Sequence, residues 1–117
     1  MMNTEEFINA IKTVVVNGSI ESMHETLNRP PGKKPVQDLV ELSDWFNKLN
    51  DENKRMLLKV IKQSVEMSVF SFLCILDGVT AIEDDQIKGR LTLHYEKNNI
   101  KKLLNDSNEE YLHNLFR

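Results

Sequence analysis

Four carboxylates follow the longest apolar stretch of the chain. Asp77 comes directly after SVFSFLCIL, and Glu83, Asp84 and Asp85 come a few residues later. Clustered carboxylate oxygens are the ligands that Mg²⁺ and Ca²⁺ take in proteins, so this segment is a candidate cation site. The spacing matches no EF-hand loop, and three consecutive acids point in different directions. A solvated loop without a metal is the favoured interpretation, and Glu83, Asp84 and Asp85 form a candidate docking patch for a partner protein.

The histidines and the single cysteine do not have the spacing of a metal-binding or catalytic site. HETLN at 24–28 begins like a zinc-binding H-E-x-x-H helix, but the second imidazole position is Asn28. His94 and His113 have no cysteine or second histidine beside them, and structural roles are expected for both. Cys74 lies within FLCIL and is expected to be a small buried hydrophobe. We therefore expect no catalytic residue, no metal and no cofactor, and not an enzyme, although distant residues could still build a pocket.

A basic loop offers a different chemistry. Arg29, Lys33 and Lys34 lie in the stiff turn RPPGKKP. Four further basic residues share one face of a later predicted helix: Lys54, Arg55, Lys59 and Lys62. If the two groups meet, they form an anion site, although the loop has no Walker A frame and no interleaved aromatic residues. A regulator that contacts nucleic acid or phosphate through the Arg29–Lys34 loop is therefore the alternative hypothesis.

The only tryptophan, Trp45, precedes Phe46 on a predicted helix. One of two adjacent aromatic residues on a helix must lie nearer the edge of the core. A Trp45 side chain partly buried over the core is the simpler interpretation. An exposed Trp45 would instead mark a protein-binding surface, because tryptophan is enriched among the residues that dominate interface energies.

The composition limits the class of protein. With 117 residues, 40% of them hydrophobic, the chain has enough apolar side chains for a single packed domain over residues 1–117. The net charge of −3 gives no general attraction to nucleic acid or anionic membranes. The uncharged stretch 67–76 is shorter than the roughly 20 residues of a membrane span, and no signal peptide is recognisable. One cysteine permits no internal disulfide, so a cytoplasmic location is expected.

Hydrophobic spacing predicts four helices in the first two thirds of the chain. Asn3 and Glu6 have capping-box spacing, and Asn17-Gly18 is expected to end the first helix. The residues expected on its inner face are Phe7, Ile8, Ile11, Val14 and Val15. A short second helix ends before the prolines, a third covers 36–49, and a fourth runs from an Asp51 cap to Leu76 or Asp77. The second half of the fourth helix is apolar all round, which predicts a central helix with contacts on all sides.

The hydrophobic period then changes to two in RLTLHYEKNNIKKLLN. Asn98-Asn99 is predicted to be a two-residue hairpin turn, which places Glu96 opposite Lys101. Ser107 and Glu110 have capping-box spacing and predict a final helix that begins there. The expected fold is mainly α (α+β): a bundle of about four helices with a long central helix, a C-terminal β-hairpin and a short final helix.

Four segments carry a resemblance to a family of small uncharacterised bacterial proteins: GKKPVQDLVELSDWFNKL, DGVTAIEDD, GRLTLHY and LLNDSNEEYLHNLF. The likeness covers most of the chain from Arg29 onward. The size, acidic charge and helical make-up of this family are similar in type to those of immunity proteins, which cover the basic active site of a toxin. This resemblance implies a protein-binding role but assigns no site residue.

The leading hypothesis is thus a small cytoplasmic bacterial protein-binding module, such as an immunity-like inhibitor of a basic partner. Its candidate contact residues are Trp45, Glu83, Asp84 and Asp85, because complementary charges steer association. A protein partner is favoured over nucleic acid, and no membrane contact is expected. Both a monomer and a homodimer remain open.

Overall fold

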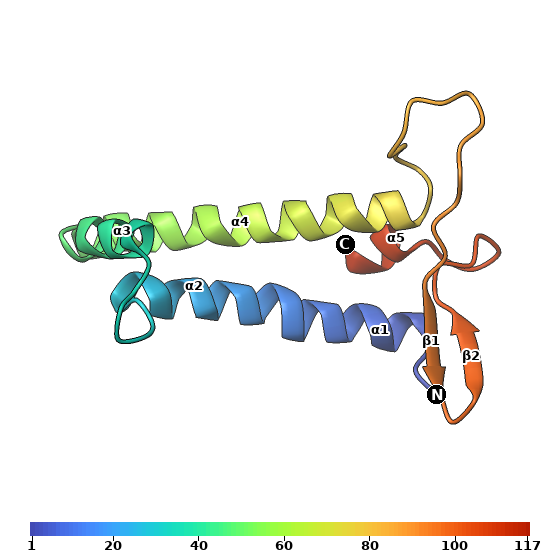
Figure 1. Cartoon of the computed structure of the whole chain (residues 1–117), viewed down its shortest axis with the longest axis horizontal. Helices are drawn as coiled ribbons and strands as arrows, with labels where there is room; N and C mark the ends of the chain where they lie inside the picture. The colour runs from blue at the N-terminus through green and yellow to red at the C-terminus, as the bar shows by residue number, and fades with distance from the viewer. The chain divides into compact units, whose positions relative to one another are not determined.

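The computed structural model describes residues 1–117 and is mainly helical, with one two-stranded sheet (Figure 1). It confirms the predicted fold class, including the long helix, the hairpin near the C-terminus and the short final helix. The chain forms two compact units, which we name the terminal unit (Met1–Thr13 with Met67–Arg117) and the middle unit (Val14–Glu66). The single domain predicted for residues 1–117 stays a prediction. None of the helices combines the length and the apolar character that crossing a membrane requires.

The N-terminal helical segment is continuous through α1 (Thr4–Ala10), the π-helix η1 (Ile11–Asn17) and α2 (Gly18–Asn28). The Asn3–Glu6 capping box is confirmed, since the Asn3 side chain accepts a hydrogen bond from the Glu6 backbone N–H at 2.8 Å. The predicted break at Asn17-Gly18 is wrong, because Asn17 has right-handed helical φ and ψ angles of −64° and −40°. A glycine costs a helix only about 1 kcal/mol relative to alanine, which packing can offset.

The π-helix also changes which valine points inward. Val16 is buried, whereas Val14 and Val15, which were expected on the inner face, are exposed. In a π-helix the backbone bond joins residues five apart instead of four, so each turn holds more residues than an α turn. The α-helical spacing used for the prediction therefore loses phase across Ile11–Asn17.

In the middle unit, α2 packs against α3 (Gln37–Asn47). The buried hydroxyl of Ser43 donates to the Leu27 carbonyl at 2.8 Å, and the Asn47 amide donates to the Asn28 carbonyl at 3.2 Å. These bonds satisfy carbonyls in the last turn of α2 that have no partner within the helix. The prolines after Asn28 end α2 as predicted.

The long helix α4 (Asp51–Leu76) begins after Asn50, whose side chain accepts from the Asn53 N–H at 2.8 Å. Asn50 therefore provides the cap that was predicted for Asp51. The predicted stop at Asp77-Gly78 is confirmed, because Gly78 has a φ of 76° and its N–H donates to the Ile75 carbonyl. The next N–H, from Val79, donates to the Cys74 carbonyl, which completes a Schellman C-cap.

The core of the terminal unit consists of Ile8 from α1, Leu73 from α4 and Leu112 from α5 (Leu112–Phe116). Each of these buried side chains contributes about 1.5–3 kcal/mol relative to full exposure. The contacts predicted on all sides of the second half of α4 are not found, since Met67 and Phe72 are exposed. The partly buried residues that surround the core are Phe7, Val69, Leu76, Leu115 and Phe116.

The hairpin pairs β1 (His94–Lys97) with β2 (Ile100–Leu103) in the predicted antiparallel register, with Glu96 opposite Lys101. The predicted Asn98-Asn99 turn is confirmed, because φ is 52° and 64° at these residues. Two successive positive φ angles match the turn that joins twisted strands most readily.

The last helix, α5, begins later than predicted, at Leu112, and the proposed Ser107–Glu110 capping box does not start it. Its first two N–H groups, from Leu112 and His113, instead donate to the Asp77 carboxylate at 3.0 and 2.9 Å. At its other end, the Lys12 ammonium lies 3.4 Å from the Leu115 carbonyl. Because so short a helix is marginal by itself, these distant side chains hold its ends.

Candidate functional site

The connection between α4 and β1, residues 77–93, is the longest segment without helix or strand and is here named the acidic loop. Loops beyond roughly 12–15 residues without their own secondary structure are uncommon in compact domains and are usually functional or disordered. In Figure 1 the acidic loop, coloured yellow to orange, extends away from the end of α4 before it returns to β1. The geometry of this loop therefore determines whether Glu83, Asp84 and Asp85 are accessible to a partner.

Asn105, only 5% exposed, holds the two ends of the acidic loop together. Its side-chain N–H groups donate to the carbonyls of Leu76 and Leu91, both at 2.7 Å. Its side-chain oxygen accepts from the Leu93 N–H at 2.8 Å. The Arg90 guanidinium adds a bond of 2.8 Å to the Asn105 carbonyl. Every hydrogen-bonding group of the Asn105 amide thus joins the end of α4 to the far end of the loop.

Asp77 does not belong with the other three acids. Its carboxylate, 2% exposed, accepts the two α5 N–H groups and lies 2.6 Å from the Nδ1 atom of His113. No group of three or more His, Cys, Asp or Glu side chains is arranged to hold a metal ion. The Asp77 oxygens are already engaged, so the original set of four candidate cation ligands separates into a structural residue and a surface patch.

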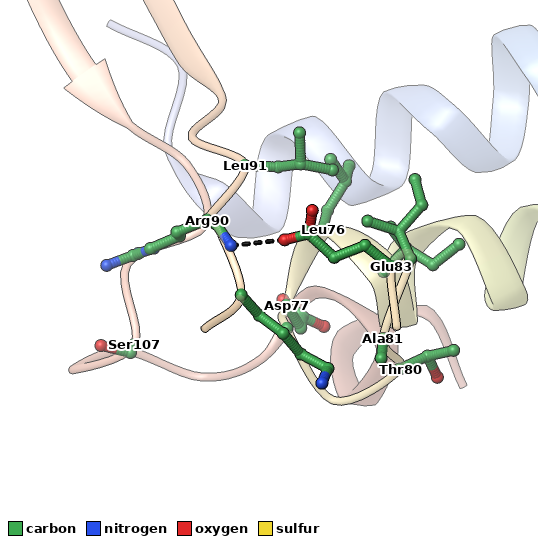
Figure 2. Close-up of a pocket in the computed structure, with 13 residues that line it drawn as sticks. Leu76, Asp77, Thr80, Ala81, Glu83, Arg90, Leu91 and Ser107 are labelled. Carbon is green, nitrogen blue, oxygen red and sulfur yellow. Dashed lines mark hydrogen bonds between the residues drawn. The ribbon is translucent and has the colours of Figure 1, made fainter. Parts of the chain in front are cut away.

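Glu83, Asp84 and Asp85 are all exposed. One Glu83 oxygen accepts from the backbone N–H of Gly89, as Figure 2 shows, and this bond closes the tip of the loop. The Lys88 ammonium donates to the Asp85 carbonyl at 2.7 Å. The carboxylates of Asp84 and Asp85 have no hydrogen-bond or ion-pair partner, so their charges are free to meet a cation from outside the chain.

Two isoleucines flank these acids on the surface. Ile82 is 67% exposed and Ile87 is 91% exposed. A single exposed apolar residue is ordinary, but two branched side chains on either side of free carboxylates form a mixed apolar and acidic surface. We name the set Ile82, Asp84, Asp85 and Ile87 the loop tip.

A pocket of about 370 Å³ lies beneath the acidic loop (Figure 2). Its walls combine apolar groups, such as Leu76, Ala81 and Leu91, with the side chains of Glu83 and Arg90. No histidine or cysteine lines it, and His94 and Glu96 of β1 are not among its lining residues. Two acids, Asp77 and Glu83, and two basic residues, Lys88 and Arg90, also line it, so the pocket is a recess of mixed apolar and charged character without a Cys or His to act as nucleophile or base.

Trp45, for which a partly buried and an exposed position were both open, is 49% exposed, whereas its neighbour Phe46 is buried. Trp45 lies on α3 in the middle unit, and Glu83, Asp84 and Asp85 lie in the terminal unit. The structure thus gives two separate candidate surfaces.

The predicted anion-binding residues Arg29, Lys33 and Lys34 are exposed. The basic residues of α4 are partly engaged within the chain. Arg55 pairs with Glu52 at 2.6 Å, Lys62 approaches Glu66 at 4.0 Å, and the Lys54 ammonium lies over the Phe46 ring. A combined anion site formed by these α4 side chains and the Arg29–Lys34 loop stays a prediction.

The histidines and Cys74 have the structural surroundings that were expected of them. His113 stacks on Tyr111 and meets Phe70 edge to face, in addition to its bond to Asp77. His24 is exposed at the edge of the Phe46 ring. Cys74 is buried and free.

Sequence reasoning missed Asn105, Ile82 and Ile87. The partners of Asn105 lie far away in the chain, so no local pattern marks it. The exposure of the two isoleucines could have been predicted, because residues 77–93 show no helical or strand pattern until Leu91 and form a segment too long for an ordinary turn.

No protein-family model, curated protein or solved structure matches this chain. The resemblance to small bacterial proteins of the immunity type is therefore an untested hypothesis. Any functional proposal has to be argued from the residues of the loop tip and of α3.

Proposed function

We propose that the protein is a protein-binding module whose loop tip docks onto a basic surface of a partner, in the manner of an immunity-like inhibitor. The observation that carries this proposal is the exposure of Ile82 and Ile87 on either side of the unpartnered carboxylates of Asp84 and Asp85. The isoleucines supply apolar area that association would remove from water. The carboxylates supply charge that steers a basic partner and sets its orientation.

The sign of the charge favours a protein over other large partners. Nucleic acid and anionic lipid surfaces both carry negative charge and repel Asp84 and Asp85. A basic protein attracts them, and its apolar side chains can contact Ile82 and Ile87.

The anchoring of the loop supports the same proposal. Binding is weakened by the entropy lost when a mobile segment becomes ordered. The Asn105 bonds to Leu76 and Leu91 fix both ends of the acidic loop, and the bond from Gly89 to Glu83 restricts its tip. The acidic loop therefore loses less conformational entropy when it binds a partner.

A cytoplasmic role in a bacterium is part of the proposal, and the buried free thiol of Cys74 is compatible with a reducing compartment. An immunity-like role predicts that the neighbouring gene encodes a toxin with a basic active site. The purified product of that gene is then the partner to test first.

The direct test places a photo-crosslinking amino acid at Ile87 in the native host. We expect one basic protein to be captured from this position and not from the exposed control position Val14, which lies in the middle unit. The captured protein is then purified and titrated against the wild-type chain, since capture alone does not establish specific binding.

The titration is repeated with two matched variants. Asp84→Lys with Asp85→Lys reverses two free charges of the loop tip, and Glu21→Lys with Glu25→Lys reverses two exposed charges of α2. We expect the first variant to weaken binding at least about 100-fold, because like charges then face each other. The second variant should bind as the wild type does. Equal affinity of both variants, or capture of nothing at Ile87, would refute the proposal.

A further inference from the structure

A second candidate surface belongs to the middle unit and shares no residue with the loop tip. The exposed side of α3 carries Asp38, Glu41, Leu42 and Trp45. Their spacing of i, i+3, i+4 and i+7 places them on one face of the helix. The neighbouring side of the helix carries the buried Ser43 and Phe46, which face α2. We name this outward surface the acidic α3 face and include Asp44 beside it.

The first half of α4 presents a surface of the opposite charge. Arg55, Met56, Lys59 and Val60 are exposed and follow each other at i, i+1, i+4 and i+5, again on one side of the helix. We name them the basic α4 face, with Lys62 at its edge. The same side of α4 also carries Glu52, which pairs with Arg55 at 2.6 Å, and Lys62 approaches Glu66 at 4.0 Å, so Lys59 supplies the unpaired positive charge. The acidic α3 helix contains three acids and no basic residue.

The two faces match each other in apolar area as well. The acidic α3 face exposes Trp45 and Leu42, and the basic α4 face exposes Met56 and Val60. Tryptophan is among the residues that most often dominate interface energies, and methionine adapts its shape to a partner surface. The charged groups at the centre of each face also lack partners, since neither Glu41 nor Lys59 takes part in an ion pair or a hydrogen bond within the chain.

We propose that a second copy of this chain covers these faces, with the acidic α3 face of each protomer against the basic α4 face of the other. Two identical copies supply this pairing twice around a two-fold axis, which is the commonest symmetry of soluble oligomers. A single copy leaves both faces in water. The charge complementarity specifies the pairing of α3 with α4 and disfavours contacts of α3 with α3 or of α4 with α4.

The mass in solution gives the first test. Sedimentation equilibrium from about 1 µM to 1 mM should show a shift from one copy to two as concentration rises. Trp45 is the only tryptophan, so its fluorescence reports this interface alone. Its emission should move to shorter wavelength over the same concentration range, because the half-exposed ring becomes buried. A constant mass of one copy up to about 1 mM, or a series of species larger than two copies, overturns the proposal.

Two charge-reversed variants test the identity of the faces. Glu41→Lys with Asp44→Lys leaves a chain whose two faces are both basic, and Lys59→Glu with Lys62→Glu leaves a chain whose two faces are both acidic. Each variant alone should dimerise at least about tenfold more weakly than the wild type. An equimolar mixture of the two should regain association, because every α3 face then meets an α4 face of opposite charge.

The controls separate this interface from a folding defect. Far-UV circular dichroism and urea unfolding establish that each variant is folded, and Glu21→Lys with Glu25→Lys reverses two exposed acids outside both faces and should dimerise normally. Trp45→Ala should weaken dimerisation at least about 30-fold. A mixture of the two reversed variants that associates no better than either alone shows that α3 does not meet α4 and refutes the pairing.

Discussion

Replacement of Asp77 by alanine should loosen the final helix while the rest of the terminal unit stays folded. The Asp77 carboxylate is buried at the end of α4 and accepts hydrogen bonds from the backbone N–H groups of Leu112 and His113. It also bonds the His113 ring at 2.6 Å. Alanine removes all three acceptor contacts and leaves the first turn of α5 without a cap.

The expected magnitude follows from these contacts. Loss of an N-cap costs about 1 kcal/mol, and loss of a hydrogen bond to a charged group costs about 1.5–3 kcal/mol. The sum is about 3 kcal/mol, which corresponds to roughly 100-fold more frequent opening of α5. Burial of Leu112 supplies about 1.5–3 kcal/mol and keeps the helix docked most of the time.

Hydrogen exchange with mass spectrometry measures this opening directly. Amides in 112–116 should exchange roughly 100-fold faster in Asp77→Ala than in the wild type, and thermal unfolding should move down by roughly 10 °C. Asp77→Asn keeps one acceptor oxygen and should fall between the two. Asp84→Ala removes a carboxylate without partners from the same loop and should leave the exchange unchanged. Equal exchange in Asp77→Ala and Asp84→Ala would show that Asp77 does not cap α5.

Two further substitutions test the parts that support the loop and the hairpin. Asn105→Ala leaves the Leu76 and Leu91 carbonyls and the Leu93 N–H without their partner. It should therefore lower the free energy of unfolding in urea by about 2–4 kcal/mol and speed proteolytic cleavage within 77–93. Unchanged cleavage would show that Asn105 does not hold the two ends of the acidic loop together. Asn99→Gly should raise stability by about 0.5 kcal/mol, because Asn99 has a φ of 64° and Asn-Gly is the preferred pair for this turn. A lower melting temperature in the glycine variant would contradict the assigned turn geometry.

Features whose cause lies within a few residues were predictable from the sequence. The Asn3–Glu6 box, the Asn98-Asn99 turn and the stop at Gly78 each depend on the backbone preference or side-chain reach of adjacent residues. Hairpin register followed from the turn, so the pairing of Glu96 with Lys101 was also predictable. The overall class of fold came from the sum of such local signals.

Features that depend on distant partners were not predictable from local patterns. The Ser107–Glu110 spacing is a valid capping signal, but Asp77 supplies the bonds to the first turn of α5 from far away in the chain. Asn17-Gly18 is a valid stop signal, but the chain continues as a helix through it. For the candidate site, Glu83, Asp84 and Asp85 were identified correctly as exposed, whereas the burial of Asp77 depends on its contacts with α5 and the exposure of the adjacent isoleucines was not predicted.

The position of Asn105 has a consequence for how this protein can diversify. Because one buried amide gathers both ends of the 77–93 segment, residues 79–89 between them contribute little to the packing of Ile8, Leu73 and Leu112. The entropy of closing such a segment grows only slowly, by about 0.6 kcal/mol for each doubling of its length. The segment can therefore be exchanged as a cassette. Asp77 and Gly78, which cap α5 and end α4, stay fixed, and chains with the same scaffold but different residues at 79–89 would be expected to recognise different partners.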